Sequence, residues 1–241
     1  MLSRTINTLY KRLPLLMIYL ISVGYIPLNA QDFPVDNYLK QIGDNANIYN
    51  GKLETVYNTS LYDNYPYFIS ADFTPASIIY RNNYYPNQNV RLDLFKEQLI
   101  IIPPEKRFGI IVNSQNVEKV YMYDRVFVNL SPPKESGLKT GFYMLLMEGE
   151  KMQLFSKHSY NIQQNNVLTF YFDRKIQYYL LFNNKYSTVK DKGSFSKLFP
   201  QFKKQINQFS KENKLNFKKN ADESLALIAG YCEKLINSMN K

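Results

Sequence analysis

The most constraining feature of this sequence is a long region of short apolar runs separated by turn residues. From Gly51 to Thr188 the runs are rich in β-branched and aromatic residues, and none shows the 3.6-residue period of a helix. This pattern predicts strands at Leu53–Asn58, Tyr67–Ala71, Ser77–Tyr80, Tyr84–Tyr85, Val90–Leu94, Leu99–Ile102, Ile110–Val112, Val117–Tyr123, Val126–Leu130, Gly141–Glu148, Met152–Lys157, Val167–Asp173, Gln177–Phe182 and Tyr186–Lys190.

Four of the gaps between these runs have the composition of hairpin turns. They are Arg81-Asn82-Asn83, Asp124-Arg125, Glu148-Gly149-Glu150 and Asn183-Asn184. Asn and Gly accept the positive φ of tight hairpins, so consecutive strands pair antiparallel. A parallel sheet would need helices between the strands, and none is visible before residue 194. We therefore expect a mainly β (α+β) fold, built on an antiparallel meander that is sandwich-like or barrel-like.

The period changes to that of a helix after Ser194. Phe195, Leu198, Phe199, Phe202, Ile206 and Phe209 share one helical face, and Pro200 divides this run into a short helix and a second one that begins at the proline. A further helix follows Asn220, with Glu223 placed for a capping box and a stripe formed by Leu225, Ile228, Ala229, Cys232, Leu235, Ile236 and Met239. We expect these amphipathic helices to pack on the β region, and membrane-surface binding is the alternative.

The N-terminus has the three parts of a secretory signal peptide. Arg4, Lys11 and Arg12 precede an apolar core, and Ala30 stands at the expected cleavage position before Gln31. The domain prediction is therefore a signal peptide at 1–30, a β domain at 31–193 and a helical segment at 194–241. The polar stretch after Gln31 contains a candidate short helix at Val35–Gln41. The core is short for a spanning helix, and no Cys stands directly after it for lipidation. We expect an exported protein, periplasmic or outer-membrane-associated, without a transmembrane segment after processing.

The charge of the chain is strongly positive. Thirty Lys and Arg residues face 20 Asp and Glu residues, a net charge of +10, which falls to +7 without residues 1–30. In an exported protein this favours an envelope protein or an anionic envelope surface as partner, and not a nucleic acid. Lys203, Lys204, Lys218 and Lys219 fall outside the apolar stripes and form the candidate basic surface. The alternative is compositional, because Lys, Asn, Ile, Tyr and Phe share A/T-rich codons.

Residues able to perform catalysis are few. The chain has one His and one Cys, which leaves no multi-ligand Cys/His zinc site. His158 is expected on the surface and Cys232 as a buried thiol on a helix stripe. We expect no catalytic residue, no metal and no cofactor. Five acids could in principle meet across a sheet, but the sequence selects no pair: Asp72, Asp93, Asp124, Asp173 and Glu148.

Aromatic residues provide the other candidate surface. The chain has 21 Tyr and 16 Phe but no Trp. Tyr offers contact area and a hydroxyl group at low entropic cost, so the loop that contains Asn82, Asn83, Tyr84 and Tyr85 could touch a ligand or partner. The alternative is that the Tyr residues cover sheet faces.

Several segments resemble uncharacterised exported β-rich proteins of Bacteroidota-type bacteria. The resemblance rests on the Tyr-x-x-x-x-Val-x-Leu-x-Leu pattern from Tyr85 to Leu94, the hairpin at Leu146–Gly149 and the helix start Leu198-Phe199-Pro200. It implies an envelope location and no known activity. We therefore expect a non-catalytic envelope protein that acts as a binding or assembly module. The alternative is a hydrolase that acts on glycan or peptidoglycan through an unidentified carboxylate pair.

Overall fold

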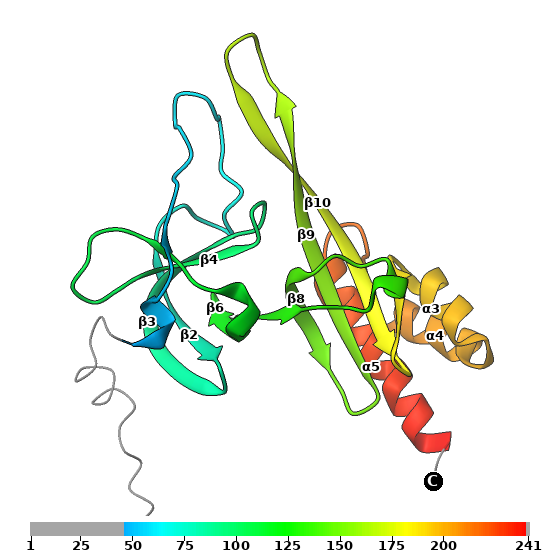
Figure 1. Cartoon of the computed structure of the whole chain (residues 1–241). Helices are drawn as coiled ribbons and strands as arrows, with labels where there is room; N and C mark the ends of the chain where they lie inside the picture. The colour runs from blue at the N-terminus through cyan, green and yellow to red at the C-terminus, as the bar shows by residue number, and fades with distance from the viewer. Residues whose placement is uncertain (1–45, 240–241) are drawn as a thin grey trace, which may run out of the picture. The chain divides into compact units, whose positions relative to one another are not determined.

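A computed structural model describes residues 46–239, which form an antiparallel sheet with helices packed on it (Figure 1). The predicted signal peptide, its cleavage site at Ala30–Gln31 and the candidate helix at Val35–Gln41 lie outside the described residues. The strands are β1 (Lys52–Leu53), β2 (Thr74–Tyr80), β3 (Asn83–Asp93), β4 (Gln98–Ile102), β5 (Ile110–Ile111), β6 (Val117–Met122), β7 (Arg125–Leu130), β8 (Gly141–Glu148), β9 (Met152–Gln164), β10 (Phe170–Phe182) and β11 (Lys185–Val189).

The helices follow the sheet. They are α3 (Lys192–Leu198), α4 (Lys203–Glu212) and α5 (Ala221–Met239), and the 3-10 turn η5 (Pro200–Phe202) lies between the first two. Further 3-10 turns are η2 (Asn47–Tyr49), η3 (Ser114–Asn116) and η4 (Lys134–Ser136). The mainly β (α+β) prediction is confirmed.

The eleven strands form one open sheet in the order β1-β5-β4-β3-β2-β6-β7-β8-β9-β10-β11. The chain runs as a meander from β2 to β5, returns to place β6 beside β2, and runs as a second meander from β6 to β11. The expected single meander is therefore two meanders joined by the β2–β6 pair. The sheet is also open, whereas a sandwich-like or barrel-like domain was expected.

The hairpin turns form where the sequence predicts them. Arg81 and Asn82 have φ of 50° and 61°, and Asn183 and Asn184 have φ of 49° and 59°. These are the left-handed conformations that two-residue hairpins require. The β6–β7 turn is shifted by one residue from the prediction, because Tyr123 and Asp124 turn with φ of 50° and 55° while Arg125 already belongs to β7.

One face of the sheet carries two apolar cores. In the β2–β7 part, residues such as Ile78, Leu92 and Phe127 pack on one another in the first core. In the β8–β11 part, the helices cover Met152, Leu154 and Leu180 to form the second core. Leu146 of β8 contacts both. A smaller cluster around Tyr143 and Phe155 lies on the opposite face, as the period-2 alternation of β8 and β9 requires.

The helical segment follows most of the predicted stripes, but Leu198 and Met239, which the stripes included, are 37% and 67% exposed. Asp191 caps α3 by accepting a hydrogen bond from the backbone N–H of Ser194 at 2.8 Å, and Pro200 starts the next turn as expected. Phe195, Phe199, Phe202 and Ile206 are buried, as are Leu225, Ile228, Ala229 and Cys232. The predicted packing of these helices on the β region is confirmed.

Two predicted strands are wrong. Strand structure at Leu53–Asn58 stops after Leu53, and Tyr67–Ala71 forms only an isolated bridge at Tyr67 and a bend with Ile69 at φ 63°. The predicted strand at Val167–Asp173 begins later, at Phe170, because Val167 and Leu168 lie in the turn between β9 and β10. Segment 54–73 is held by side-chain contacts, which a local pattern does not show.

Candidate functional site

The predicted contact loop lies at the β2–β3 hairpin. Asn82, Asn83 and Tyr84 are exposed, and the Tyr84 hydroxyl group donates a hydrogen bond to Ser77 Oγ at 3.0 Å. Tyr85 is buried, and its ring meets the Tyr80 ring edge-on with centroids 6.2 Å apart. Tyr85 thus belongs to the core, and only the first three residues are placed to touch a partner.

The predicted basic residues lie at the two ends of one connected stretch. Lys203 and Lys204 open α4, and Lys218 and Lys219 stand just before α5. All four are exposed. The Asn216 side chain accepts the backbone N–H groups of Lys218 and Lys219 at 3.1 and 3.0 Å, which fixes the chain at that turn.

The positive charge is concentrated in one segment, which we call the lysine segment, residues 190–219. It holds nine lysines and two acids. Outside residues 1–30 and the lysine segment, basic and acidic residues balance at 18 each. A codon bias would spread lysines along the chain, so this distribution argues against the compositional explanation. Summing the net charge over successive stretches of the sequence would have identified the whole segment. Our prediction named only four of its lysines.

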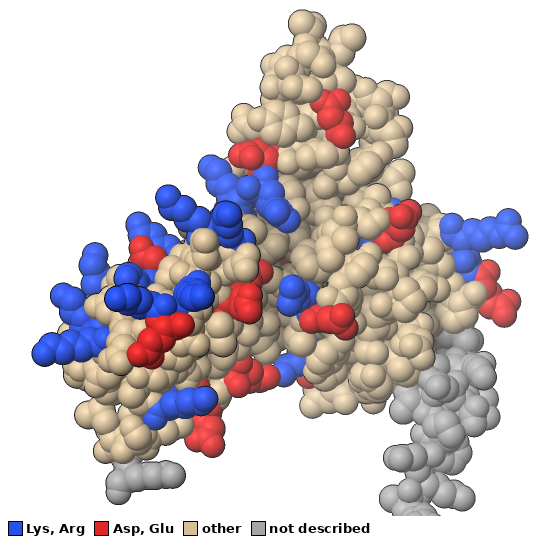
Figure 2. All heavy atoms as spheres, turned by 180° about the vertical axis from the view of Figure 1, so that it is seen from behind, with Lys and Arg blue, Asp and Glu red and all other residues tan. Residues whose placement is uncertain are grey.

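The surroundings of these lysines leave them free to meet an anion. Figure 2 shows Lys and Arg gathered at the left of the view, over α3 and α4. Apolar side chains of the same helices, including Phe202 and Ile206, are buried beneath. Three ion pairs elsewhere in the described part of the chain involve none of these lysines: Arg91–Glu54, Lys119–Glu148 and Lys157–Glu97.

The position of Lys203 and Lys204 is also unfavourable for the helix. They occupy the first turn of α4, which contains no acid. The N-terminus of a helix carries a partial positive charge, so cations there reduce helix stability slightly. Helix stability therefore does not account for these two lysines.

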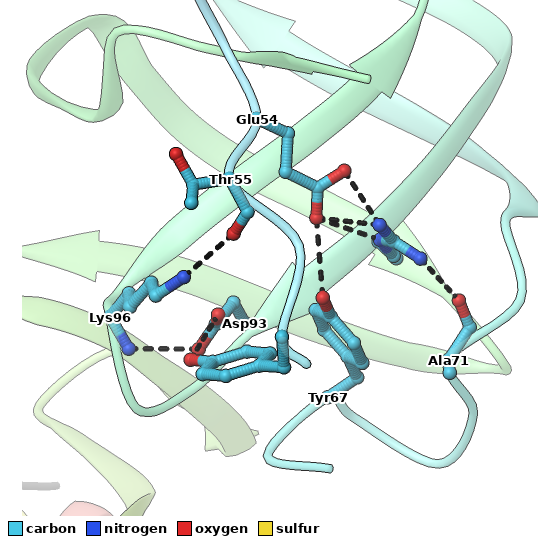
Figure 3. A network of polar contacts seen from close by, with 8 residues as sticks. Glu54, Thr55, Tyr67, Ala71, Asp93 and Lys96 are labelled. Carbon is cyan, nitrogen blue, oxygen red and sulfur yellow. Dashed lines mark hydrogen bonds and ion pairs between the residues drawn. The ribbon is translucent and has the colours of Figure 1, made fainter. Parts of the chain in front are cut away.

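A second polar cluster surrounds Arg91, and Figure 3 labels its partners Glu54, Tyr67 and Ala71. Its Nη2 contacts both carboxylate oxygens of Glu54 at 2.6 Å, and its Nη1 donates to the carbonyl oxygen of Ala71 at 2.8 Å. The guanidinium group lies 4.6 Å from the Tyr67 ring centroid and 4.4 Å from that of Phe73. The Arg91 and Glu54 side chains are only 12% and 6% exposed. These contacts fasten segment 54–73 to β3.

Asp93, on the same strand, holds a neighbouring part of this segment. Its carboxylate accepts hydrogen bonds from the backbone N–H groups of Phe95 and Lys96 at 2.9 and 2.8 Å and from the Tyr57 hydroxyl group at 2.8 Å. Burial raises the pKa of Asp93, while these hydrogen bonds oppose the rise. Burial is also the largest cause that raises the pKa of Tyr57, followed by its bond to Asp93.

A third cluster pairs Glu97 with Lys157. The Lys157 Nζ lies 2.6 Å from Glu97 Oε1 and donates to the carbonyl oxygen of Phe142 at 3.0 Å. Glu97 Oε2 accepts the backbone N–H of Phe142 at 2.7 Å. Burial raises the pKa of Glu97 and lowers that of Lys157, and their mutual attraction opposes both shifts. The contacts of Asp93 and Glu97 are those of structural anchors that join distant segments.

His158 corrects the expectation of a surface histidine. Its side chain is buried, with 5% exposure, beside the ring of Phe68. Within the described residues, neither ring nitrogen has a hydrogen-bond partner, nor does the hydroxyl group of the nearby Ser156. Burial, followed by the positive charge of Arg174, lowers the pKa of His158 to about 4, so the ring is neutral at pH 7. Cys232 is buried as predicted, and burial raises the pKa of its thiol to about 12.

Residues 46–239 contain no group of three or more His, Cys, Asp and Glu side chains that could hold a metal ion. Among the same residues, no helix is long and apolar enough to cross a membrane. Comparison with protein-family models, with curated proteins and with solved structures finds no match to this chain.

Proposed function

We propose that this chain is a non-catalytic exported protein of the cell envelope, periplasmic or outer-membrane-associated, that acts as a binding module for an anionic envelope surface. The observation that carries the proposal is the lysine segment, which holds nine lysines against two acids and in which all nine lysines are exposed. The alternative is a hydrolase that acts on glycan or peptidoglycan, and no feature of residues 46–239 favours it.

The physical basis is electrostatic attraction between the lysine ammonium groups and the many phosphate groups of an anionic surface, each of which binds weakly. A lysine ammonium group is a compact, strongly hydrated point charge, suited to phosphate groups on a surface without a shaped pocket. Each basic residue near an anionic membrane contributes on the order of 1 kcal/mol at physiological salt, and the attraction fades within a Debye length of about 8 Å. Several lysines held together by one packed segment therefore bind much more strongly than the same number spread over the molecule.

Vesicle binding tests the proposal. The purified protein should sediment with vesicles of phosphatidylglycerol and phosphatidylcholine, and should remain in solution with vesicles of phosphatidylcholine alone. Replacing Lys203, Lys204, Lys218 and Lys219 by Gln should weaken binding at least about tenfold, because the lysine segment loses four charges.

A control variant removes the same charge elsewhere. Lys134, Lys151, Lys175 and Lys185 are exposed and lie outside the lysine segment, so replacing them by Gln should change binding much less. Equal loss in the two variants would show that only net charge matters. If neither variant lost affinity, the lysine segment would not be the binding surface, and an envelope protein would become the leading partner.

Export is tested separately. N-terminal sequencing of the protein recovered from the envelope should begin at or near Gln31. Recovery of the protein with Met1 retained would contradict the signal peptide, whatever the vesicles show.

A further inference from the structure

The outer part of the β9–β10 hairpin leaves one strand edge unpaired. β8 pairs with β9 only through Gln153–Ser156, and the hairpin continues beyond the end of β8 (Figure 1). Within the described part of the chain, residues Lys157 to Gln164 of β9 pair with β10 on one edge and with no strand on the other. The far edge of β10 is covered instead, because Phe170 exchanges backbone hydrogen bonds with Leu61 and Asp63.

The hydrogen bonds of β10 show which groups of β9 face outward. The N–H and C=O groups of Phe170 and Phe172 point away from β9, toward residues 61–64. Their cross-strand partners are Gln164 and Ile162. In an antiparallel ladder, two directly opposite residues either exchange backbone hydrogen bonds with each other, or both direct their N–H and C=O groups away from the partner strand. Ile162 and Gln164 therefore direct their backbone N–H and C=O groups to the free edge. Tyr160, two residues before Ile162, directs its groups to the same edge.

This edge has none of the usual features that discourage pairing. Residues 158–172 contain no Lys, Arg, Asp, Glu or Pro. Natural sheets normally protect an exposed edge with a charge, a proline or a bulge. Asn161, Ile162, Gln163 and Gln164 are all exposed, and Ile162 is a large aliphatic side chain with 41% exposure.

We propose that a second copy of this chain adds to the edge, so that two β9 strands pair antiparallel about a two-fold axis at Ile162. In this register Tyr160 faces Gln164 of the second copy, Ile162 faces Ile162, and Gln164 faces Tyr160. Each of these three pairs joins residues that both direct N–H and C=O groups outward, so the ladder is complete on both strands. A symmetric interface must be self-complementary, and this segment meets that condition.

The second copy suits the edge better than a charged partner peptide. No like charges meet at the axis, because the nearest charged residues of the hairpin are Lys157, Asp173 and Arg174 at its base. The two Ile162 side chains cover one another. The contact involves few residues, so it belongs to the weak class of interfaces. We expect a dissociation constant of about 10–100 µM for the dimer.

Disulfide trapping gives a direct test. Opposite residues in a hydrogen-bonded pair have Cα atoms about 5.5 Å apart, which a disulfide can span. The natural Cys232 is buried, so Ile162→Cys provides the accessible thiol. Under mild oxidation it should form covalent dimers at least about tenfold faster than Val167→Cys. Val167 is 89% exposed at the tip, away from the axis, which makes it the matched control.

Proline substitution provides the second test. The Ile162 N–H faces the free edge, so Ile162→Pro removes an outward donor and leaves the β9–β10 bonds intact. The unchanged protein should dimerise in sedimentation at about 100 µM, and Ile162→Pro should remain monomeric. Amide exchange at Tyr160, Ile162 and Gln164 should slow as concentration rises, whereas that at Asn161 and Gln163 should not change.

Two results would overturn the proposal. One is an unchanged protein that stays monomeric at these concentrations, which would leave an extended segment of another protein as the occupant. The other is equal cross-linking of Ile162→Cys and Val167→Cys.

Discussion

Arg91 contacts the rings of Tyr67 and Phe73 and binds the carboxylate of Glu54, so it joins β3 to three separate points of segment 54–73. Replacing Arg91 by Leu would leave the Glu54 carboxylate buried without its partner. Breaking a buried pair in this way costs about 3–5 kcal/mol, so the free energy of unfolding in urea should fall by about that amount.

The exposed pair Lys119–Glu148 is the matched control for this prediction. Its atoms are 3.4 Å apart, and the Lys119 and Glu148 side chains are 31% and 51% exposed, far more than those of Arg91 and Glu54. Replacing Lys119 by Leu should change the free energy of unfolding by less than about 1 kcal/mol. Similar losses at Arg91 and Lys119 would mean that the buried contacts do not hold segment 54–73.

His158 should make stability depend on pH. The unfolded chain binds a proton at an ordinary pKa of 6.5, but the folded chain does so only near pH 4. The stability due to this difference is complete above pH 6.5 and is lost as the pH falls toward 4. The total is about 3 kcal/mol.

His158→Phe should remove this pH dependence. Its free energy of unfolding should fall less than that of the unchanged protein between pH 6.5 and 4. The comparison of the two proteins cancels the other titrating groups, such as Asp93 and Glu97. Parallel curves for the two proteins would show that His158 keeps an ordinary pKa.

At the scale of elements, α5 shows how the helices hold the sheet. Leu225 is fully buried in the second core, whereas Leu227, two residues later, is 45% exposed. Leu225→Ala should cost about 2–5 kcal/mol, and Leu227→Ala less than about 1 kcal/mol, in thermal or urea unfolding. A small loss at Leu225 would indicate that the helices are a detachable module.

The same geometry predicts the result of truncation. Removing everything after Gly193 would uncover Met152, Leu154 and Leu180, which the helices cover. An apolar patch of this kind drives association, so a chain that ends there should be insoluble or rapidly cleaved.

At the scale of the whole molecule, the main features are the segregation of charge and the continuity of the sheet. The lysine segment covers the helical end, while the free edge of β9 belongs to a hairpin whose outer part is uncharged. Surface binding through the first and pairing through the second would use separate residues. Binding to anionic vesicles should therefore weaken as salt rises, whereas the β9 pairing should change little.

Local patterns determined much of the fold. The hairpin turns follow from residues that accept positive φ, as at Asn183 and Asn184. The helices follow from stripes such as Leu225, Ile228 and Cys232, which periodicity alone identifies. Both signals involve residues close in sequence, whose preferences act before any long-range contact forms.

Only the tertiary structure decided the remaining features. The β2–β6 pairing, the contacts of Arg91 with segment 54–73 and the burial of His158 depend on residues far apart in sequence. The free edge of β9 likewise exists because β8 stops short of it. Such contacts form when they bury enough apolar surface and satisfy enough polar groups to offset the entropy of closing long loops. That balance depends on the whole chain, so no local sequence pattern predicts these contacts.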